Sequence, residues 1–113
     1  MAYDTELADR LLRATEHLPE ITTRKMFGGF AVMWRGNMLA GVIGDDLMVR
    51  IGADAYEDAL NQPGAATMEF TGRPMKGMVT VLADHVSSEE DVADWVERAV
   101  TFVETLPAKE AVP

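Results

Sequence analysis

The side chains best suited to chemistry in this sequence are bases in the middle of the chain: Arg24, Lys25, Arg50, Arg73 and Lys76. Guanidinium and ammonium groups bind carboxylates and phosphates through charge-assisted hydrogen bonds. Several of these bases adjoin glycine-rich backbone, where N–H groups can approach a ligand closely. Two interpretations stay open: the bases converge on an anionic ligand, or they are scattered solubilising charges and ion-pair partners.

Residues typical of metal binding and nucleophilic catalysis are sparse. The two histidines, His17 and His85, lie far apart in the sequence, and the chain has no cysteine. A metal site would therefore need carboxylates gathered by the fold. The segment Asp84-His85, followed by Ser87 and Ser88, contains the residue types of a catalytic triad, but helix capping by Ser87 explains the serines better. We expect no enzyme activity, no catalytic residue, no cofactor and no metal site.

Glycines between residues 28 and 44 superficially suggest a phosphate-binding loop. Such a loop lies between a strand and the N-terminus of a helix. Here strands are expected on both sides of Gly28-Gly29 and of the segment from Gly41 to Gly44. The glycines at the start of a strand therefore predict a bulge or close backbone packing.

The elements that must position these residues include two long amphipathic helices, one near each end of the chain. Asp4 or Thr5 can cap the first helix, and Pro19 stops it. Its apolar stripe comprises Leu7, Ala8, Leu11, Leu12, Thr15 and Leu18. Ser87 and Glu90 have the spacing of a capping box at the start of the second helix. The stripe of that helix comprises Val92, Trp95, Val96, Ala99, Val103 and Leu106.

Short apolar runs separated by turn residues predict three strands, over residues 30–34, 38–43 and 47–51. The tight turns leave no room for crossover helices, so these strands are expected to form an antiparallel meander.

A short helix is expected next, because Asp54 and Glu57 also have the spacing of a capping box. Two further strands follow over residues 67–70 and 77–82. In the loop between them, Pro74 has no backbone N–H and is expected to lie outside the hydrogen-bonded ladder.

The order helix, three strands, helix, two strands, helix predicts a two-layer α+β domain: an antiparallel five-stranded sheet with helices on one face. We expect one domain over residues 1–106 and a flexible tail over residues 107–113. The chain has 113 residues, a net charge of −9 and no cysteine. It shows no signal peptide or membrane-spanning segment. This composition fits the cytoplasm, excludes a disulfide framework and disfavours direct binding to nucleic acid.

Methionine is concentrated in the region of the expected sheet, at Met26, Met33, Met38, Met48, Met68, Met75 and Met78. Alternation along the strand 47–51 puts Met48 and Arg50 on one face and the other apolar residues on the opposite face. If those apolar residues face the helices, Met48 and Arg50 look out from the open face of the sheet. An open face that bears methionines indicates contact with a partner or a second copy; the alternative is that the methionines fill the core.

The run Arg24-Lys25-Met26-Phe27-Gly28-Gly29-Phe30 is followed by an expected strand and then by the segment Gly36-Asn37-Met38. A second expected strand comes next, and after it the segment Asp45-Asp46-Leu47-Met48-Val49-Arg50. This pattern, above all its R-x-M-F-G-G stretch, resembles the N-terminal domain of the TfoX/Sxy family. Residues 70–77 look like the variant found in stand-alone bacterial proteins. The resemblance covers about residues 5 to 106, nearly the whole chain.

The resemblance implies the same order of elements, with an antiparallel sheet as in secretion-chaperone-like folds. The family's named members are regulators of bacterial competence that are thought to act with a transcription activator, and they are not known as enzymes. They carry a second, C-terminal domain. We expect this chain to be the stand-alone form, without that second domain.

The main hypothesis is a small cytoplasmic regulatory domain that binds a protein partner or forms a homodimer, with no membrane contact. The residues assigned to this interaction are Arg24, Met26, Phe27, Gly28, Gly29, Met33, Met48, Arg50, Arg73 and Lys76. The alternative is a small anionic-ligand-binding protein, or an unrecognised enzyme, whose ligand lies beside Arg24, Lys25, Arg73 and Lys76.

Overall fold

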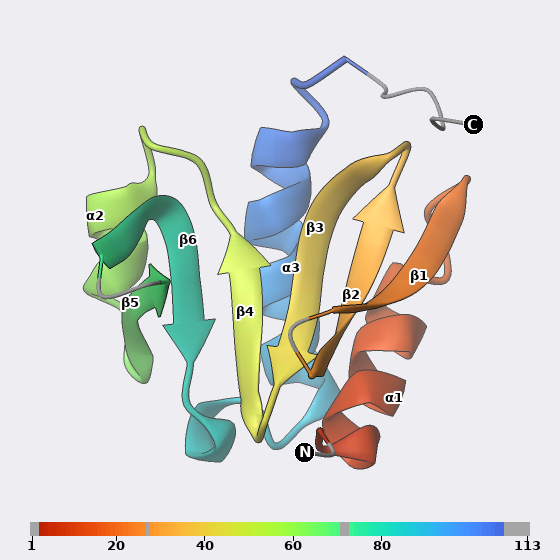
Figure 1. Cartoon of the computed structure of the whole chain (residues 1–113), viewed down its shortest axis with the longest axis horizontal. Helices are drawn as coiled ribbons and strands as arrows, with labels where there is room; N and C mark the ends of the chain where they lie inside the picture. The colour runs from red at the N-terminus through yellow and green to blue at the C-terminus, as the bar shows by residue number, and fades with distance from the viewer. Residues whose placement is uncertain (1–2, 27, 71–72, 108–113) are drawn as a thin grey trace.

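The computed structural model describes residues 3–26, 28–70 and 73–107, which form a six-stranded antiparallel sheet with two long helices behind it (Figure 1). The strands are β1 (Ile21–Met26), β2 (Gly29–Trp34), β3 (Asn37–Ile43), β4 (Asp46–Arg50), β5 (Ala65–Phe70) and β6 (Arg73–Val81). The helices are α1 (Thr5–Thr15), α2 (Tyr56–Leu60) and α3 (Glu89–Val103), and a 3₁₀ turn, η1, spans Ala83–His85. None of the helices in the described ranges has the length and hydrophobicity that a membrane-spanning helix requires.

The prediction of five strands is wrong by one, because residues 21–26 form an additional strand at the edge of the sheet. β1 pairs with β2 from Ile21, opposite Trp34, to Met26, opposite Gly29. Its first three residues are Ile-Thr-Thr, whose β-branched side chains favour extended backbone. Its middle residues are polar and exposed. An edge strand of this kind buries little, so no apolar run marks it in the sequence.

The sheet has the order β1-β2-β3-β4-β6-β5, and every neighbouring pair is antiparallel. After the predicted meander the chain passes through α2, returns as β5 at the far edge and continues into β6 beside β4. β6 begins at Arg73, earlier than predicted, and Pro74 stands opposite Glu69 next to a register shift between Thr67 and Glu69. The expectation that Pro74 lies outside the ladder is wrong, and the irregular pairing accommodates its missing N–H.

The main core lies between the sheet and the helices. One buried cluster joins all three helices to alternating apolar residues of β2, β3, β4 and β6; its sheet side includes Phe30, Val32, Trp34, Val42, Leu47, Val49, Val79 and Val81. The helices therefore cover one face of the sheet, as predicted. In the stripe predicted for α1, Leu12 is the outlier, since it is 37% exposed.

Both predicted capping boxes begin one residue too early. α3 starts after Ser88, not Ser87, and the Ser88 hydroxyl accepts a hydrogen bond of 3.1 Å from the backbone N–H of Asp91. A neighbouring serine thus preserves the cap when the boundary moves by one position. α2 starts after Ala55, not Asp54, and has no side-chain cap, because alanine carries no acceptor. The spacing of the capping boxes predicted α2 and α3 but not the exact residue at which either helix begins.

Candidate functional site

The face of the sheet opposite the helices carries a second apolar cluster, separate from the main core. Its buried members are Ala31, Met48, Met68 and Met78, and the half-buried residues packed against them are Met33, Met38 and Ile43. We call these seven residues the methionine face. In Figure 1 this face of the sheet is turned toward the viewer, with α1 and α3 behind it.

The register of the sheet explains why these residues share a face. Residues directly opposite each other in antiparallel strands project to the same side. Gly41 of β3 stands opposite both Ala31 of β2 and Met48 of β4, and Arg24 of β1 stands opposite Ala31. A row of side chains therefore crosses the sheet from Arg24 at the edge to Met48 in the middle. The predicted orientation of Met48, away from the helices, is confirmed.

Met48 nevertheless has no exposed surface. Its side chain lies over Gly41, where an added Cβ would come within 2.4 Å of the methionine Cε. Small residues at Gly41 and Ala31 leave a shallow space that a flexible thioether side chain can fill. Core filling is therefore confirmed for Met48, Met68 and Met78, whereas Met33 and Met38 remain partly exposed. Contact of the exposed methionines with a partner or a second copy stays a prediction.

A β-bulge sets the exposed part of the face. The pairing of β2 with β3 shifts between Val32 and Met33, so that Met33 stands opposite Met38. The extra residue, Leu39, remains fully buried in the main core. The bulge thus places two half-buried methionines side by side without exposing the core.

Arg50 lies at the end of β4, opposite Met78, and belongs to the same face. Its guanidinium donates a long hydrogen bond, 3.5 Å, to the carbonyl oxygen of Met38 and lies 5.7 Å from the centre of the Phe102 ring. Such a cation–π contact orients a guanidinium without neutralising its charge. Among the described residues the ion pairs are Arg13–Glu89 and Arg98–Asp58, so Arg50 has no carboxylate partner there.

The four bases proposed around an anionic ligand do not form one site in this fold. Arg24 and Lys25 lie on β1, and Lys76 lies on β6, four strands away and therefore roughly 19 Å across the sheet. Arg24 and Lys25 also project to opposite faces, since Lys25 stands opposite Phe30 of the main core. Arg73 lies in β6, but its side chain is outside the described residues. Arg50 lines a cleft together with Lys76.

The Gly28-Gly29 pair lies in the hairpin between β1 and β2. Gly28 has a φ of 72°, in the left-handed region that favours glycine. Gly29 is buried, and an added Cβ would lie 2.3 Å from the carbonyl oxygen of Val42. The prediction of close backbone packing at the start of a strand is confirmed. Phe27 and the side chain of Met26 lie outside the described residues.

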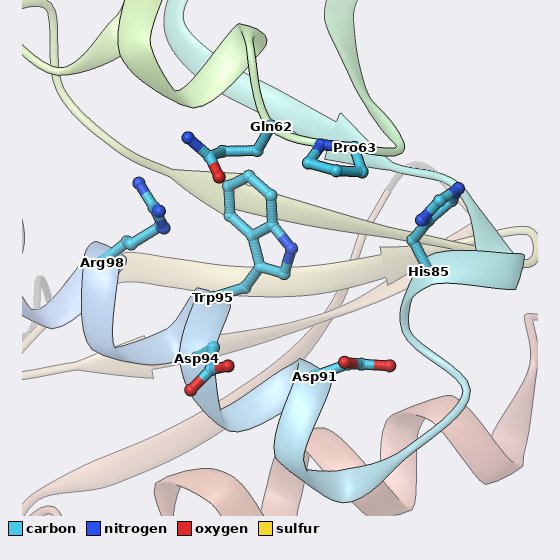
Figure 2. Close-up of a pocket in the computed structure, with 7 residues that line it drawn as sticks. All are labelled: Gln62, Pro63, His85, Asp91, Asp94, Trp95 and Arg98. Carbon is cyan, nitrogen blue, oxygen red and sulfur yellow. The ribbon is translucent and has the colours of Figure 1, made fainter.

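A separate hollow of about 220 Å³ lies between α3, η1 and the loop after α2 (Figure 2). Trp95 occupies its middle, below Gln62 and Pro63, and the carboxylates of Asp91 and Asp94 point in different directions. In the part of the chain that the structure describes, no three His, Asp or Glu side chains form a group that could hold a metal ion. We place the candidate site on the methionine face, where Met33, Met38 and Ile43 remain partly exposed.

Sequence reasoning missed Phe102, which the structure places under Arg50. Phe102 stands next to Val103 but outside the apolar stripe predicted for the last helix. A large aromatic residue one position off a helical stripe is the signal that could have indicated a contact at the edge of the helix.

The family model described as the TfoX N-terminal domain matches residues 13–103, from the last turn of α1 to the end of α3. No protein of curated function matches the chain.

Proposed function

Because the chain belongs to the TfoX N-terminal domain family, we propose that it is a regulatory domain that acts by binding another protein. The observation that carries this proposal is the methionine face, an apolar layer that no helix covers within the described residues. The named regulators that the sequence resembles are thought to act with a transcription activator, so a transcription-related partner in the bacterial cytoplasm is the proposed class.

The composition of the face supports a protein partner. Met33, Met38 and Ile43 are partly exposed at its surface, and methionine side chains adapt their shape to a partner at little cost. Arg24 and Arg50 lie on the same face, toward its edge and its end. The complementary surface has apolar residues at its centre and acidic residues around them.

A second copy of the chain fits this face less well. Two-fold pairing brings the same surface of each copy together, so it places the bases of the two methionine faces in one interface. Negative charge is abundant instead at the start of α3, at Glu89, Glu90 and Asp91, on the other side of the sheet. A contact between the methionine face and α3 of another copy is head-to-tail and does not close into a two-fold dimer.

The proposal is tested with two variants that add the same charge on opposite sides of the sheet. Met33→Glu places a carboxylate in the methionine face, and Thr101→Glu places one at an exposed position of α3. When each variant is used to capture a protein partner, we expect the wild type and Thr101→Glu to bind the same protein. We expect Met33→Glu to lose binding of that protein. Retention of every partner by Met33→Glu contradicts the proposal. If native mass spectrometry shows a dimer for the wild type and a monomer for Met33→Glu, the molecule that occupies the methionine face is a second copy of the chain.

A further inference from the structure

β4 ends, β6 begins and α3 reaches its last turns at the same end of the sheet (Figure 1). A cleft of about 350 Å³ lies there, at one end of the methionine face. Its lining includes two bases, three apolar side chains and a glycine: Arg50, Lys76, Met38, Met78, Phe102 and Gly52. We call it the Arg50 cleft. Its volume is at the lower end of the range for small-molecule sites, which run from about 300 to 1,000 Å³.

The charge of this cleft is opposite to that of the whole protein. The chain carries a net charge of −9, yet among the described residues the charged side chains that line the cleft are both bases, Arg50 and Lys76. Neither base forms an ion pair with a carboxylate among the described residues. A guanidinium has five N–H donors, and that of Arg50 uses one in its long bond to the Met38 carbonyl. Donors therefore remain for an anion.

The floor of the cleft is closely packed and holds Phe102 in place. Gly52 has a φ of 88°, and an added Cβ there would lie 2.3 Å from the Phe102 ring. The backbone N–H groups of Ile51 and Gly52 both donate to the carbonyl oxygen of Gly77, at 2.7 and 3.0 Å. The ring that supports the Arg50 guanidinium thus rests against backbone that is itself cross-linked by hydrogen bonds. Such support reduces the entropy lost when the arginine binds an anion.

The remaining lining is apolar. Met38, Met78 and Phe102 provide thioether and aromatic surface beside the two positive charges. Phe102 also lines a neighbouring hollow, and the Asp54 carboxylate lines that hollow together with Arg98. A ligand that satisfies the Arg50 cleft therefore needs an anionic group and an apolar body.

We propose that the Arg50 cleft binds a small organic anion, with its carboxylate or phosphate on Arg50 and Lys76 and its aromatic or aliphatic body against Met38, Met78 and Phe102. This inference goes beyond the proposed function, because it needs no protein partner.

The test is a titration of the ¹⁵N-labelled full chain, followed by amide chemical shifts. The probes are phenylacetate and phenyl phosphate, in which a one-atom linker joins a carboxylate or a phosphate to a phenyl ring. Phenylacetamide is the neutral match for phenylacetate, and inorganic phosphate tests the anion without an apolar body. We expect saturable shifts at Arg50, Gly52 and Gly77 with at least one aromatic anion, and at least tenfold weaker binding of phenylacetamide.

Three variants assign the site. Arg50→Met removes the guanidinium but keeps an unbranched side chain, and we expect it to weaken binding of the better probe at least tenfold. Lys76→Met removes the exposed ammonium, with an expected loss of about threefold. Lys25→Met makes the same change in net charge on the opposite side of the sheet, and we expect no change in affinity.

Phe102→Leu keeps an apolar side chain but removes the ring under the guanidinium, and we expect it to weaken binding as well. The amide spectrum shows in every case whether the variant is folded. Binding of phenylacetamide as tight as that of the better aromatic anion overturns the inference, as do undiminished binding of that anion by folded Arg50→Met and shifts confined to other parts of the chain. Loss of the partner with Met33→Glu is a separate result, so the two proposals fail independently.

Discussion

The two faces of the sheet bury apolar side chains in different ways. The helix-covered face is built mainly from Val, Leu and Ile, which have few preferred rotamers and interdigitate with α1 and α3. The methionine face has no helix over it among the described residues and is built from unbranched methionines lying over Ala31 and Gly41. The helix-covered face therefore specifies one packed structure. The methionine face covers the backbone of the sheet but leaves side chains that can adapt to another molecule.

The largest expected difference between the faces is in the cost of truncation. Leu47 is fully buried under the helices, and Leu47→Ala is expected to lower the free energy of unfolding by about 2–5 kcal/mol. Met33→Ala removes a half-buried side chain from the other face, so its loss is expected to be well below that of Leu47→Ala. Urea denaturation measures both losses. Equal losses contradict the distinction between the two faces.

Gly41→Ala tests whether small residues create the methionine face. The added methyl group meets the Cε of Met48 at 2.4 Å and the carbonyl oxygen of Phe30 at 2.5 Å. The second contact is with backbone, so a side-chain movement alone cannot relieve the overlap. We expect a loss of about 1–3 kcal/mol, seen as a lower thermal midpoint. An unchanged midpoint shows that Met48 is not packed over Gly41.

The helix-covered face depends on α3, so the cap of that helix gives a smaller and more local test. Ser88→Ala removes the acceptor for the Asp91 N–H and is expected to cost about 1 kcal/mol. Ser87→Ala, one residue earlier, removes no cap and is expected to cost less than about 0.5 kcal/mol. Denaturation of the two alanine variants compares them directly. If Ser87→Ala is the more costly change, the helix begins where the capping-box spacing predicted.

The mildest test distinguishes the two kinds of methionine by chemical reactivity. Dilute hydrogen peroxide oxidises accessible thioethers to sulfoxides. Met33 and Met38 are partly exposed, whereas Met48 has no exposed surface, so the first two are expected to react earlier. Peptide mass spectrometry after timed exposure reports the order. A bound partner on the methionine face is expected to protect Met33 and Met38, which connects this test to the proposed function.

Much of the fold follows from patterns that the sequence carries locally. The apolar stripes of the terminal helices and the alternation in β2, β3 and β4 predict the layers and the antiparallel meander, because burial selects side chains at the period of each element. β1 was not predicted, because an edge strand with exposed Arg24 and Lys25 buries too little apolar surface to require alternating apolar residues. The starts of α2 and α3 were misplaced by one residue, because the spacing of a capping box does not fix the exact residue at which a helix begins.

The site was predicted less completely than the fold. The sequence identified Arg50 and Met48 as residues of the face away from the helices, since alternation along a strand is a local property. Its grouping of Arg24 and Lys25 with Lys76 does not match the strand order, which separates β1 from β6 by three strands. Phe102 lies far along the chain from Arg50, and no local pattern records that contact.

The sequence by itself determined which residues alternate, which form amphipathic helices and which family the chain resembles, because these depend on residue types at short spacings. Only the tertiary structure decided that Met48 is covered, that Met33 and Met38 stay at the surface, and that Arg50 meets Phe102 and Lys76 at one cleft. Those outcomes depend on strand order, a β-bulge and the end of α3, which bring distant segments together. Contacts between distant segments are set by packing of the whole chain, so spacing along the sequence does not specify them.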